Sequence, residues 1–339
     1  MKIGIYGSGA IGCYLGGRLA AQGADVQFLC RPSMYEVLKE HGLTLTDGLG
    51  YRQFLEPANI DLTMQANDLK ECDYIFICVK SSATEQAAIE LNTVLAEKRT
   101  IIISFQNGVS NVPSLKKILT SHTVLEGMVP FNVAIQNEGH FHQGTQGDLF
   151  VKSFQQQEAL KTKFNNASLK IQFVEDMLSV QWAKVLINLN NSINALSKLP
   201  LKEQLSQKKY RECLAIVQRE ALSVLKKANI TPAHLTPLPA RLIPSILVLP
   251  NFLFKIVSRK MLAIDPLARS SMQDDLSQGK LTEIDWINGE IIRLADQLSA
   301  QVPANQYLFD LIKKQENASS YHSMSADLLY SDLMKASKG

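Results

Sequence analysis

The sequence has few cysteines and no excess of one charge, and each absence excludes a class of protein. Its 339 residues include five cysteines, none of them in a C-x-x-C motif. This pattern argues against a disulfide-built secreted domain and predicts thiols in a reducing, cytoplasmic compartment. The formal net charge of +3 is too small to indicate a nucleic-acid or membrane partner.

Metal-ligand clusters and membrane-spanning runs are also missing. His140 and His142 form an H-x-H pair, but no third ligand stands nearby, so we expect an exposed hairpin and no metal site. The most apolar stretch, residues 242–257, contains prolines and a lysine and is shorter than the ~20 residues that span a bilayer. We expect it to form a buried helical hairpin or a surface that faces a partner. The chain opens directly on a strand pattern, so we expect no signal peptide.

A glycine-rich motif lies at the start of the chain. Residues 1–31 predict a strand, a tight turn, a helix and a second strand, which is the order of a dinucleotide-binding βαβ unit. Gly7 permits the turn, Gly9 lets the backbone approach a pyrophosphate, and Gly12 lets the helix pack against the strand. The helix N-terminus offers N–H groups to the phosphates. The predicted phosphate-binding residues are Gly7, Ser8, Gly9, Ala10, Ile11 and Gly12.

The end of the second strand indicates which dinucleotide is bound. NAD-specific sites usually carry an acidic residue there, which binds the ribose 2′-OH. This strand ends in Cys30 and Arg31 instead. A guanidinium can hold a 2′-phosphate through two hydrogen bonds, so we predict NADP(H). The alternative is a solvated arginine that follows a strand.

Alternating strand and helix patterns continue through the N-terminal half. Residues 74–79 and 100–105 are apolar runs typical of strands buried on both faces, and they are followed by Lys80 and Asn107. Ligands bind beyond the carboxyl ends of such strands, so both residues are candidate cofactor ligands. We expect β-hairpins and a short helix over residues 141–173.

The C-terminal half reads as long helices, over residues 176–199, 208–228, 265–278 and 282–300, with a partly loose tail after Lys313. The predicted fold is thus α/β, with an N-terminal Rossmann-type doubly wound sheet followed by an all-α C-terminal domain. We place an NADP-binding domain at residues 1–174 and a helical substrate and catalytic domain at residues 175–339.

A polar stripe follows the first long helix. At 100° per residue, Lys184, Asn188 and Asn191 lie within about 60° of one another, opposite the apolar face. A solvent face is the ordinary explanation for polar helix positions. Asparagine is a poor helix former, however, so its abundance here favours specific hydrogen bonding.

Glu283 is a second polar candidate. Thr282 and Asp285 have the spacing of a capping box, which would place Glu283 in the first turn of a helix. The helix dipole favours a carboxylate there, so this position has a structural explanation as well as a functional one.

Together these residues resemble the ketopantoate reductase family (2-dehydropantoate 2-reductase), which uses NADPH to make D-pantoate for coenzyme A synthesis. The resemblance covers residues 7–289 and rests on the glycine motif, Arg31, Lys80, Gln106-Asn107-Gly108, Trp182-x-Lys184-x-x-x-Asn188, Ser270-Ser271-Met272-x-Asp274-Asp275 and Thr282-Glu283-Ile284-Asp285. It implies that Lys184 is the general acid, that Glu283 and Ser271 bind substrate, and that Asn107 and Asn188 line the site.

Two features depart from the family pattern. Family members often carry a second helical asparagine eight residues after the lysine, where this chain has Ser192, so Asn191 or Asn194 is expected to substitute. The apolar segment 238–264 precedes the serine motif and can alter the pocket or an oligomer interface. Both departures leave the 2-oxo acid open.

The expected chemistry is coherent, because a lysine ammonium stabilises the negative charge that forms on a carbonyl oxygen during its reduction and can donate the proton. We therefore predict NADPH-dependent reduction of ketopantoate to D-pantoate, with a small-molecule 2-oxo acid as partner and a homodimer left open. The alternatives are a reductase of another 2-oxo acid, a non-catalytic NADP-binding sensor and a 3-hydroxy acid dehydrogenase. A sensor would have lost the Lys184 and Glu283 pair, and a 3-hydroxy acid dehydrogenase gains no support from the Ser271 to Glu283 block.

Overall fold

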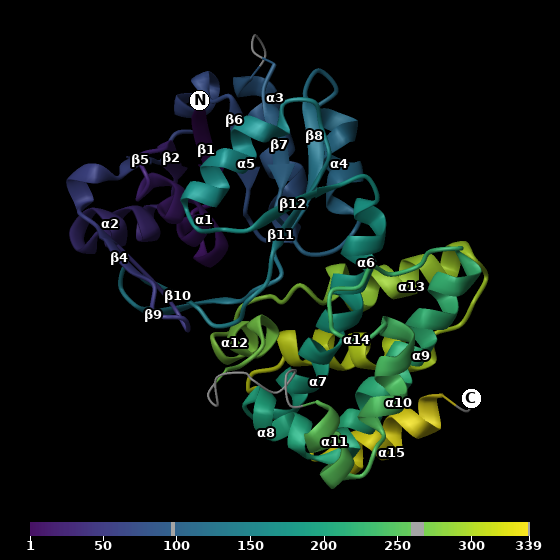
Figure 1. Cartoon of the computed structure of the whole chain (residues 1–339). Coiled ribbons are helices and arrows are strands. Elements are labelled where there is room, and N and C mark those ends of the chain that lie inside the picture. Colours follow the sequence, from purple (N-terminus) through teal and green to yellow (C-terminus); the bar gives the residue numbers. More distant parts are fainter. Residues whose placement is uncertain (96–98, 259–267, 338–339) are drawn as a thin grey trace. The chain divides into compact units, whose positions relative to one another are not determined.

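The computed structural model describes residues 1–95, 99–258 and 268–337 (Figure 1). The chain forms two compact units. The first unit holds residues 1–106 and 110–177, and the helical unit holds residues 107–109 and 178–339. The boundary between the two units lies inside a helix, between residues 177 and 178. The turn 107–109 belongs to the helical unit, although residues on both sides of it belong to the first unit. The domain boundary expected at residues 174 and 175 stays a prediction.

The first unit is built on an eight-stranded sheet of order β12-β11-β8-β7-β6-β1-β2-β5. The strands from β5 to β8 pair in parallel, β11 is antiparallel to β8, and β12 is parallel to β11. The parallel part has the strand order of a dinucleotide-binding doubly wound sheet. Its strands are β1 (Lys2–Tyr6), β2 (Asp25–Leu29), β5 (Asp61–Thr63), β6 (Tyr74–Ile77), β7 (Ile101–Ser104), β8 (Thr123–Met128), β11 (Leu149–Lys152) and β12 (Ile171–Val174).

Helices cover both faces of this sheet, as the apolar strands require. Along β6, Phe76 packs into a core with residues of α1 and α5, whereas Ile75 and Ile77 pack into a core with α3 and α4. This arrangement confirms the expected α/β fold. The helices are α1 (Ala10–Ala20), α2 (Pro32–His41), α3 (Thr84–Val94), α4 (Asn111–Ile118) and α5 (Gln157–Asn166), with short 3₁₀ turns η1 (Pro57–Asn59), η2 (Ala66–Glu71) and η3 (Ser81–Ala83).

A second, four-stranded sheet of order β4-β3-β10-β9 completes the first unit. Its strands are β3 (Leu43–Asp47), β4 (Arg52–Leu55), β9 (Val133–Asn137) and β10 (His140–Gln143). The β-hairpins expected over residues 141–173 are wrong in position. Strands β9 and β10 form a hairpin that begins at residue 133, and the following strands β11 and β12 are parallel to each other. His140 and His142 do lie on a hairpin strand, where Thr46 Oγ1 hydrogen-bonds to both rings at 2.8 Å. Among the described residues no group of three or more His, Cys, Asp or Glu could hold a metal.

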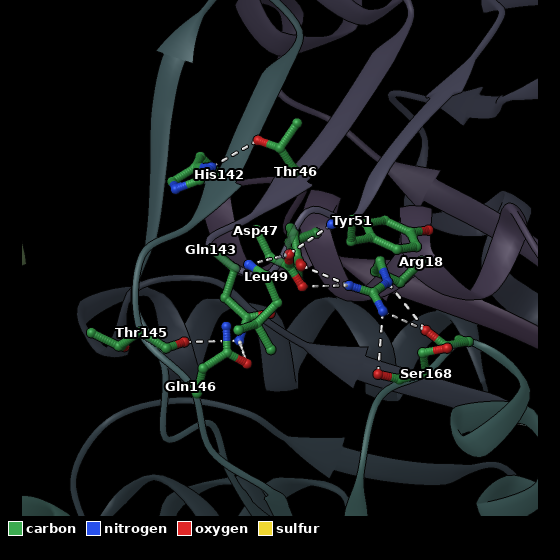
Figure 2. A network of polar contacts seen from close by, with 12 residues as sticks. Arg18, Thr46, Asp47, Leu49, Tyr51, His142, Gln143, Thr145, Gln146 and Ser168 are labelled. Atoms are coloured by element: carbon green, nitrogen blue, oxygen red, sulfur yellow. Dashed lines mark hydrogen bonds and ion pairs between the residues drawn. The ribbon is translucent and has the colours of Figure 1, made fainter. Parts of the chain in front are cut away.

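Arg18 ties α1 to this second sheet (Figure 2). Its side chain is only 2% exposed and donates hydrogen bonds to the carbonyl oxygens of Ala167 and Ser168. The guanidinium also lies 4.0 Å from Asp47 Oδ2 and stacks over the Tyr51 ring, 3.5 Å from its centroid. A buried cation is tolerated only when it is paired and hydrogen-bonded in this way. The helix that follows the glycine turn is thereby fixed at its far end.

The described residues of the second unit form helices and no strands, as expected. Its apolar core draws on most of its helices. They are α6 (Met177–Asn188), α7 (Asn190–Ser197), α8 (Leu201–Ser206), α9 (Lys208–Lys227), α10 (Ile243–Leu247), α11 (Asn251–Val257), α12 (Ser271–Ser277), α13 (Asn288–Gln297), α14 (Pro303–Glu316) and α15 (Ala326–Ala336), with 3₁₀ turns η4 (Ala240–Leu242) and η5 (Ile284–Trp286).

Several helix bounds differ from those expected. The helix predicted over 176–199 is two helices, α6 and α7, that meet at Leu189. The helix predicted over 265–278 begins at Ser271, where Ser270 caps it by accepting a hydrogen bond from Gln273 N–H, and residues 265–267 lie outside the described residues. The tail after Lys313, expected to be partly loose, carries the last residues of α14, 314–316, and all of α15.

The apolar stretch 242–257 is only partly buried. Phe254 on α11 is 2% exposed, whereas Phe252 and Ile256 of the same helix are 66% and 72% exposed. A fully buried helical hairpin is therefore wrong, and whether this face meets a partner stays a prediction. Residues 259–264 of the longer segment 238–264 lie outside the described residues. No helix in the described ranges is long and apolar enough to cross a membrane.

Candidate active site

The glycine turn between β1 and α1 has the geometry of a phosphate site. Gly7 has φ +106°, a conformation that favours glycine, and a Cβ on Gly12 would lie 2.2 Å from the Gly7 carbonyl oxygen. A Cβ on Gly9 would meet no atom within 4 Å, so this position is open to a ligand. Ala10 and Ile11 begin α1 directly after it, where main-chain N–H groups precede the first intrahelical hydrogen bond.

Ser8 does not have the role expected of a residue that binds the phosphates directly. Its side chain is 6% exposed, and both its N–H and its hydroxyl donate to the carbonyl oxygen of Leu29, at 3.2 and 2.9 Å. Ser8 therefore holds the turn against the end of β2, and its hydroxyl is engaged there.

Two cationic side chains follow the carboxyl ends of parallel strands, as the glycine turn does. Arg31 follows β2, is exposed and precedes α2, and no carboxylate stands at this strand end. Lys80 follows β6 and is exposed as well. Because β1, β2 and β6 are parallel neighbours, both cations and the glycine turn occupy one edge of the sheet.

A row of hydrogen-bonded side chains forms the candidate site in the helical unit. Asn188 Nδ2 donates to Asn107 Oδ1 at 3.3 Å, and Asn107 Nδ2 donates to Glu283 Oε2 at 2.8 Å. These two bonds select one orientation of the Asn107 amide, with its oxygen toward α6 and its nitrogen toward Glu283. Three residues far apart in the sequence are thus brought together.

Glu283 does not occupy the helix start that the sequence indicated. It precedes the 3₁₀ turn η5, and α13 begins only at Asn288. The capping box is also wrong, because Thr282 Oγ1 accepts from Ile284 N–H and donates to Glu316, while Asp285 pairs with Lys313. The dipole of a long helix therefore does not explain the carboxylate at Glu283.

Lys184 stands one helical turn before Asn188, so the two side chains share one face of α6. The Lys184 side chain is half-buried. Burial lowers the pKa of Lys184 to about 8, because the charged ammonium loses solvation. A lysine with this pKa exchanges its proton near neutral pH, which is the property of an effective general acid.

The other polar residues of this region have separate places. Asn194 is fully buried, accepts from Ser270 N–H at 3.0 Å and donates to the Leu199 carbonyl, and Ser192 is equally buried. Asn191 is half-buried, and its carbonyl accepts from the Ser270 hydroxyl. Of the three residues weighed for the second amide, only Asn191 has a partly exposed side chain. Ser271 is exposed at the start of α12.

The sequence pattern did not indicate Gln181 and Glu290, which both contact the Asn107 turn. Gln181 Nε2 donates to the Gly108 carbonyl oxygen at 3.3 Å, and Glu290 Oε1 accepts from Val109 N–H at 3.0 Å. Gln181 sits among apolar helix positions and Glu290 follows an expected helix start, so neither stands out by spacing.

Family models match both halves of the chain. The model described as "Ketopantoate reductase PanE/ApbA" matches residues 3–162, and "Ketopantoate reductase PanE/ApbA C terminal" matches residues 176–316. The chain belongs to the ketopantoate reductase family. It is an oxidoreductase of the 2-dehydropantoate 2-reductase type, which confirms the resemblance expected from its motifs.

Individual ketopantoate reductases agree with this assignment along nearly the whole chain. A 2-dehydropantoate 2-reductase of Pyrococcus horikoshii is 26% identical over 327 residues, which are 94% of this chain and 98% of that protein. A PanE/ApbA family ketopantoate reductase from Ralstonia eutropha JMP134 is 25% identical with a TM-score of 0.79, over 94% of this chain and 99% of that one. D-mandelate dehydrogenase, solved with NADH and anilino(oxo)acetate, shares the fold at 20% identity and a TM-score of 0.76, over 94% of this chain and 99% of that one.

Proposed function

We propose that this protein reduces ketopantoate to D-pantoate with NADPH. The observation that carries the proposal is the row Asn188, Asn107 and Glu283, joined by hydrogen bonds and flanked by Lys184 on the same face of α6. Amides beside a carboxylate and an ammonium suit a small acid that carries both a carbonyl and a hydroxyl group. Membership of the ketopantoate reductase family supports the same substrate.

Each residue has a distinct task in this proposal. Lys184 donates a proton to the oxygen of the substrate carbonyl as negative charge forms there. Asn188, Asn191 and Ser271 bind the substrate without adding charge. Glu283 accepts a hydrogen bond from the substrate hydroxyl, and Asn107 lines the site and keeps the Glu283 carboxylate in place.

The first unit supplies the residues for the cofactor. The open position at Gly9, the positive-φ turn at Gly7 and the N-terminus of α1 fit the pyrophosphate of a nicotinamide dinucleotide. That group supplies the hydride when it is bound. Arg31 would hold the 2′-phosphate of NADP(H), and Lys80 would add a second cation at the same sheet edge.

A reductase of a different 2-oxo acid is the second candidate. Ser192 stands where family members often carry an asparagine, and it is buried inside α7 with its hydroxyl on the Leu189 carbonyl. The site therefore has one amide fewer unless Asn191 replaces it. A homodimer and a cytoplasmic location stay predictions.

The direct test is NADPH oxidation by the purified full chain when ketopantoate is added, with the product identified as pantoate by mass and chirality. The proposal expects turnover and D-pantoate. Oxidation of NADPH with another 2-oxo acid but not with ketopantoate would support the second candidate instead.

Cofactor choice follows from Arg31. We expect Arg31→Ala to lower kcat/KM for NADPH by roughly ten- to a hundredfold and to leave the value for NADH nearly unchanged, because a hydrogen bond to a charged group contributes roughly 1.5–3 kcal/mol. Arg52→Ala is the matched control, since Arg52 is an exposed arginine on β4. Equal losses for both cofactors would show that Arg31 does not read the 2′-phosphate.

The pH dependence follows from Lys184. A proton donor works only while it is protonated, and the pKa of Lys184 is about 8. We therefore expect kcat/KM for reduction to be level below this pH and to fall about tenfold per pH unit above it. The reverse oxidation needs the neutral amine, so its rate should rise over the same range. A reduction rate that stays level up to pH 10 would exclude Lys184 as the donor.

A further inference from the structure

Two buried side chains of the helical unit hold the turn 107–109. Gln181 and Glu290 are 7% and 3% exposed, and they bond respectively to the carbonyl oxygen of Gly108 and to the N–H of Val109. A carboxylate loses much solvation when it is buried, so it is stable there only with hydrogen-bonding partners. The contact between Glu290 and this turn is therefore a strong constraint on both.

The turn approaches Glu290 more closely than most residue types would allow. Gly108 has φ +90°, and a Cβ at this position would lie 2.9 Å from Glu290 Oε1 and 3.0 Å from Trp286 Cβ. Glycine thus permits both the conformation and the contact. The turn therefore packs closely against α13 and η5, the elements that follow Glu283.

Glu290 also reaches the segment that carries Glu283. Its Oε2 lies 3.0 Å from Arg293, and the Arg293 guanidinium donates to the carbonyl oxygen of Asp285 at 2.7 Å. One carboxylate oxygen therefore holds the turn two residues after Asn107. The other, through Arg293, holds the turn two residues after Glu283.

We propose that Glu290 is a positioning residue that sets the Asn107 to Glu283 hydrogen bond. The proposal rests on the function proposed above, because it gives that bond a purpose in substrate binding. The two partners come from separate turns, and Glu290 with Arg293 joins those turns through backbone contacts two residues after each partner. Small displacements of binding groups reduce rates sharply, so a fixed pair is an advantage.

The first arm of the test does not depend on any substrate. Amide hydrogen exchange of Val109 is compared in the wild type, Glu290→Ala and Glu290→Gln. We expect Glu290→Ala to speed the exchange by at least about tenfold, because the N–H loses its acceptor, and Glu290→Gln to speed it less. Glu220→Gln is the matched control, since the Glu220 carboxylate accepts from the start of α14. Unchanged exchange in Glu290→Ala would overturn the proposal.

The second arm measures kinetics as a double-mutant cycle with Asn107→Ala. We expect Glu290→Ala to raise KM for ketopantoate by roughly tenfold while the NADPH dissociation constant stays the same, and to add little to Asn107→Ala. A merely structural role predicts a lower melting temperature, an unchanged KM and additive losses, and those results would overturn the proposal. If Glu290→Ala fails to fold, Glu290→Gln serves in its place. If the wild type reduces no 2-oxo acid, the proposed function fails, and the exchange arm still decides whether Glu290 holds the turn.

Discussion

Replacing Lys184 with alanine should lower kcat for ketopantoate reduction by at least ~10²-fold, because the reacting oxygen loses its proton donor. The dissociation constant for NADPH, measured by fluorescence, should stay nearly the same, since the glycine turn, Arg31 and Lys80 lie in the first unit and Lys184 lies in the other. The same variant should lose the fall in rate above pH 8 that the pKa of Lys184 produces.

A matched control separates this effect from a general loss of charge. Lys202 is an exposed lysine on α8 in the same unit, and Lys202→Ala should turn over normally. Near-normal turnover of Lys184→Ala would make the lysine part of the ordinary polar surface of α6, and the account of the reaction would need another acid.

We expect Glu283 to set the preference of the enzyme for ketopantoate over analogues that lack the hydroxyl group of ketopantoate. Ketopantoate differs from 2-oxoisovalerate by a terminal hydroxymethyl group, and a site that bonds a hydroxyl rejects ligands that leave its polar group unpaired. We expect Glu283→Ala to lower kcat/KM for ketopantoate by roughly ten- to a hundredfold, since a hydrogen bond to a charged group contributes roughly 1.5–3 kcal/mol. The preference over 2-oxoisovalerate should shrink by a similar factor.

Asp285→Asn provides the control for this prediction. Asp285 lies two residues further on and pairs with Lys313 at 2.6 Å, so it is a neighbouring carboxylate with a structural partner. It should leave the substrate preference intact. If Glu283→Ala lowers kcat/KM for ketopantoate and for 2-oxoisovalerate equally, Glu283 does not bind the hydroxyl group.

The nucleotide-binding part of the fold could be predicted because its signals are local. Glycines at 7, 9 and 12 sit within six residues between a strand and a helix, and a Cβ on Gly7 or Gly12 would collide with backbone atoms. Apolar runs such as residues 74–77 are buried on both faces and have no competing explanation. The second sheet was not predicted, because its strands β4 and β9 are short and largely exposed and lack the apolar run of a buried strand.

The predictions of helix ends were wrong for a different reason. The sequence around Thr282 has the spacing of a local cap, but its hydroxyl instead binds Glu316, which is 34 residues away in the sequence. Such a long-range bond leaves no trace in local spacing. The same limit hid the bond between Glu290 and Val109, which is 181 residues away in the sequence. The row Asn188, Asn107 and Glu283 was within reach because each residue carried a motif of its own.

The most direct measurement is kcat/KM of the wild type for ketopantoate and 2-oxoisovalerate, each with NADPH and with NADH. We expect ketopantoate with NADPH to give the highest value, and we expect removal of the hydroxymethyl group to lower kcat/KM roughly ten- to a hundredfold. A higher value for 2-oxoisovalerate, or for NADH as the donor, would contradict the substrate or the cofactor assigned here.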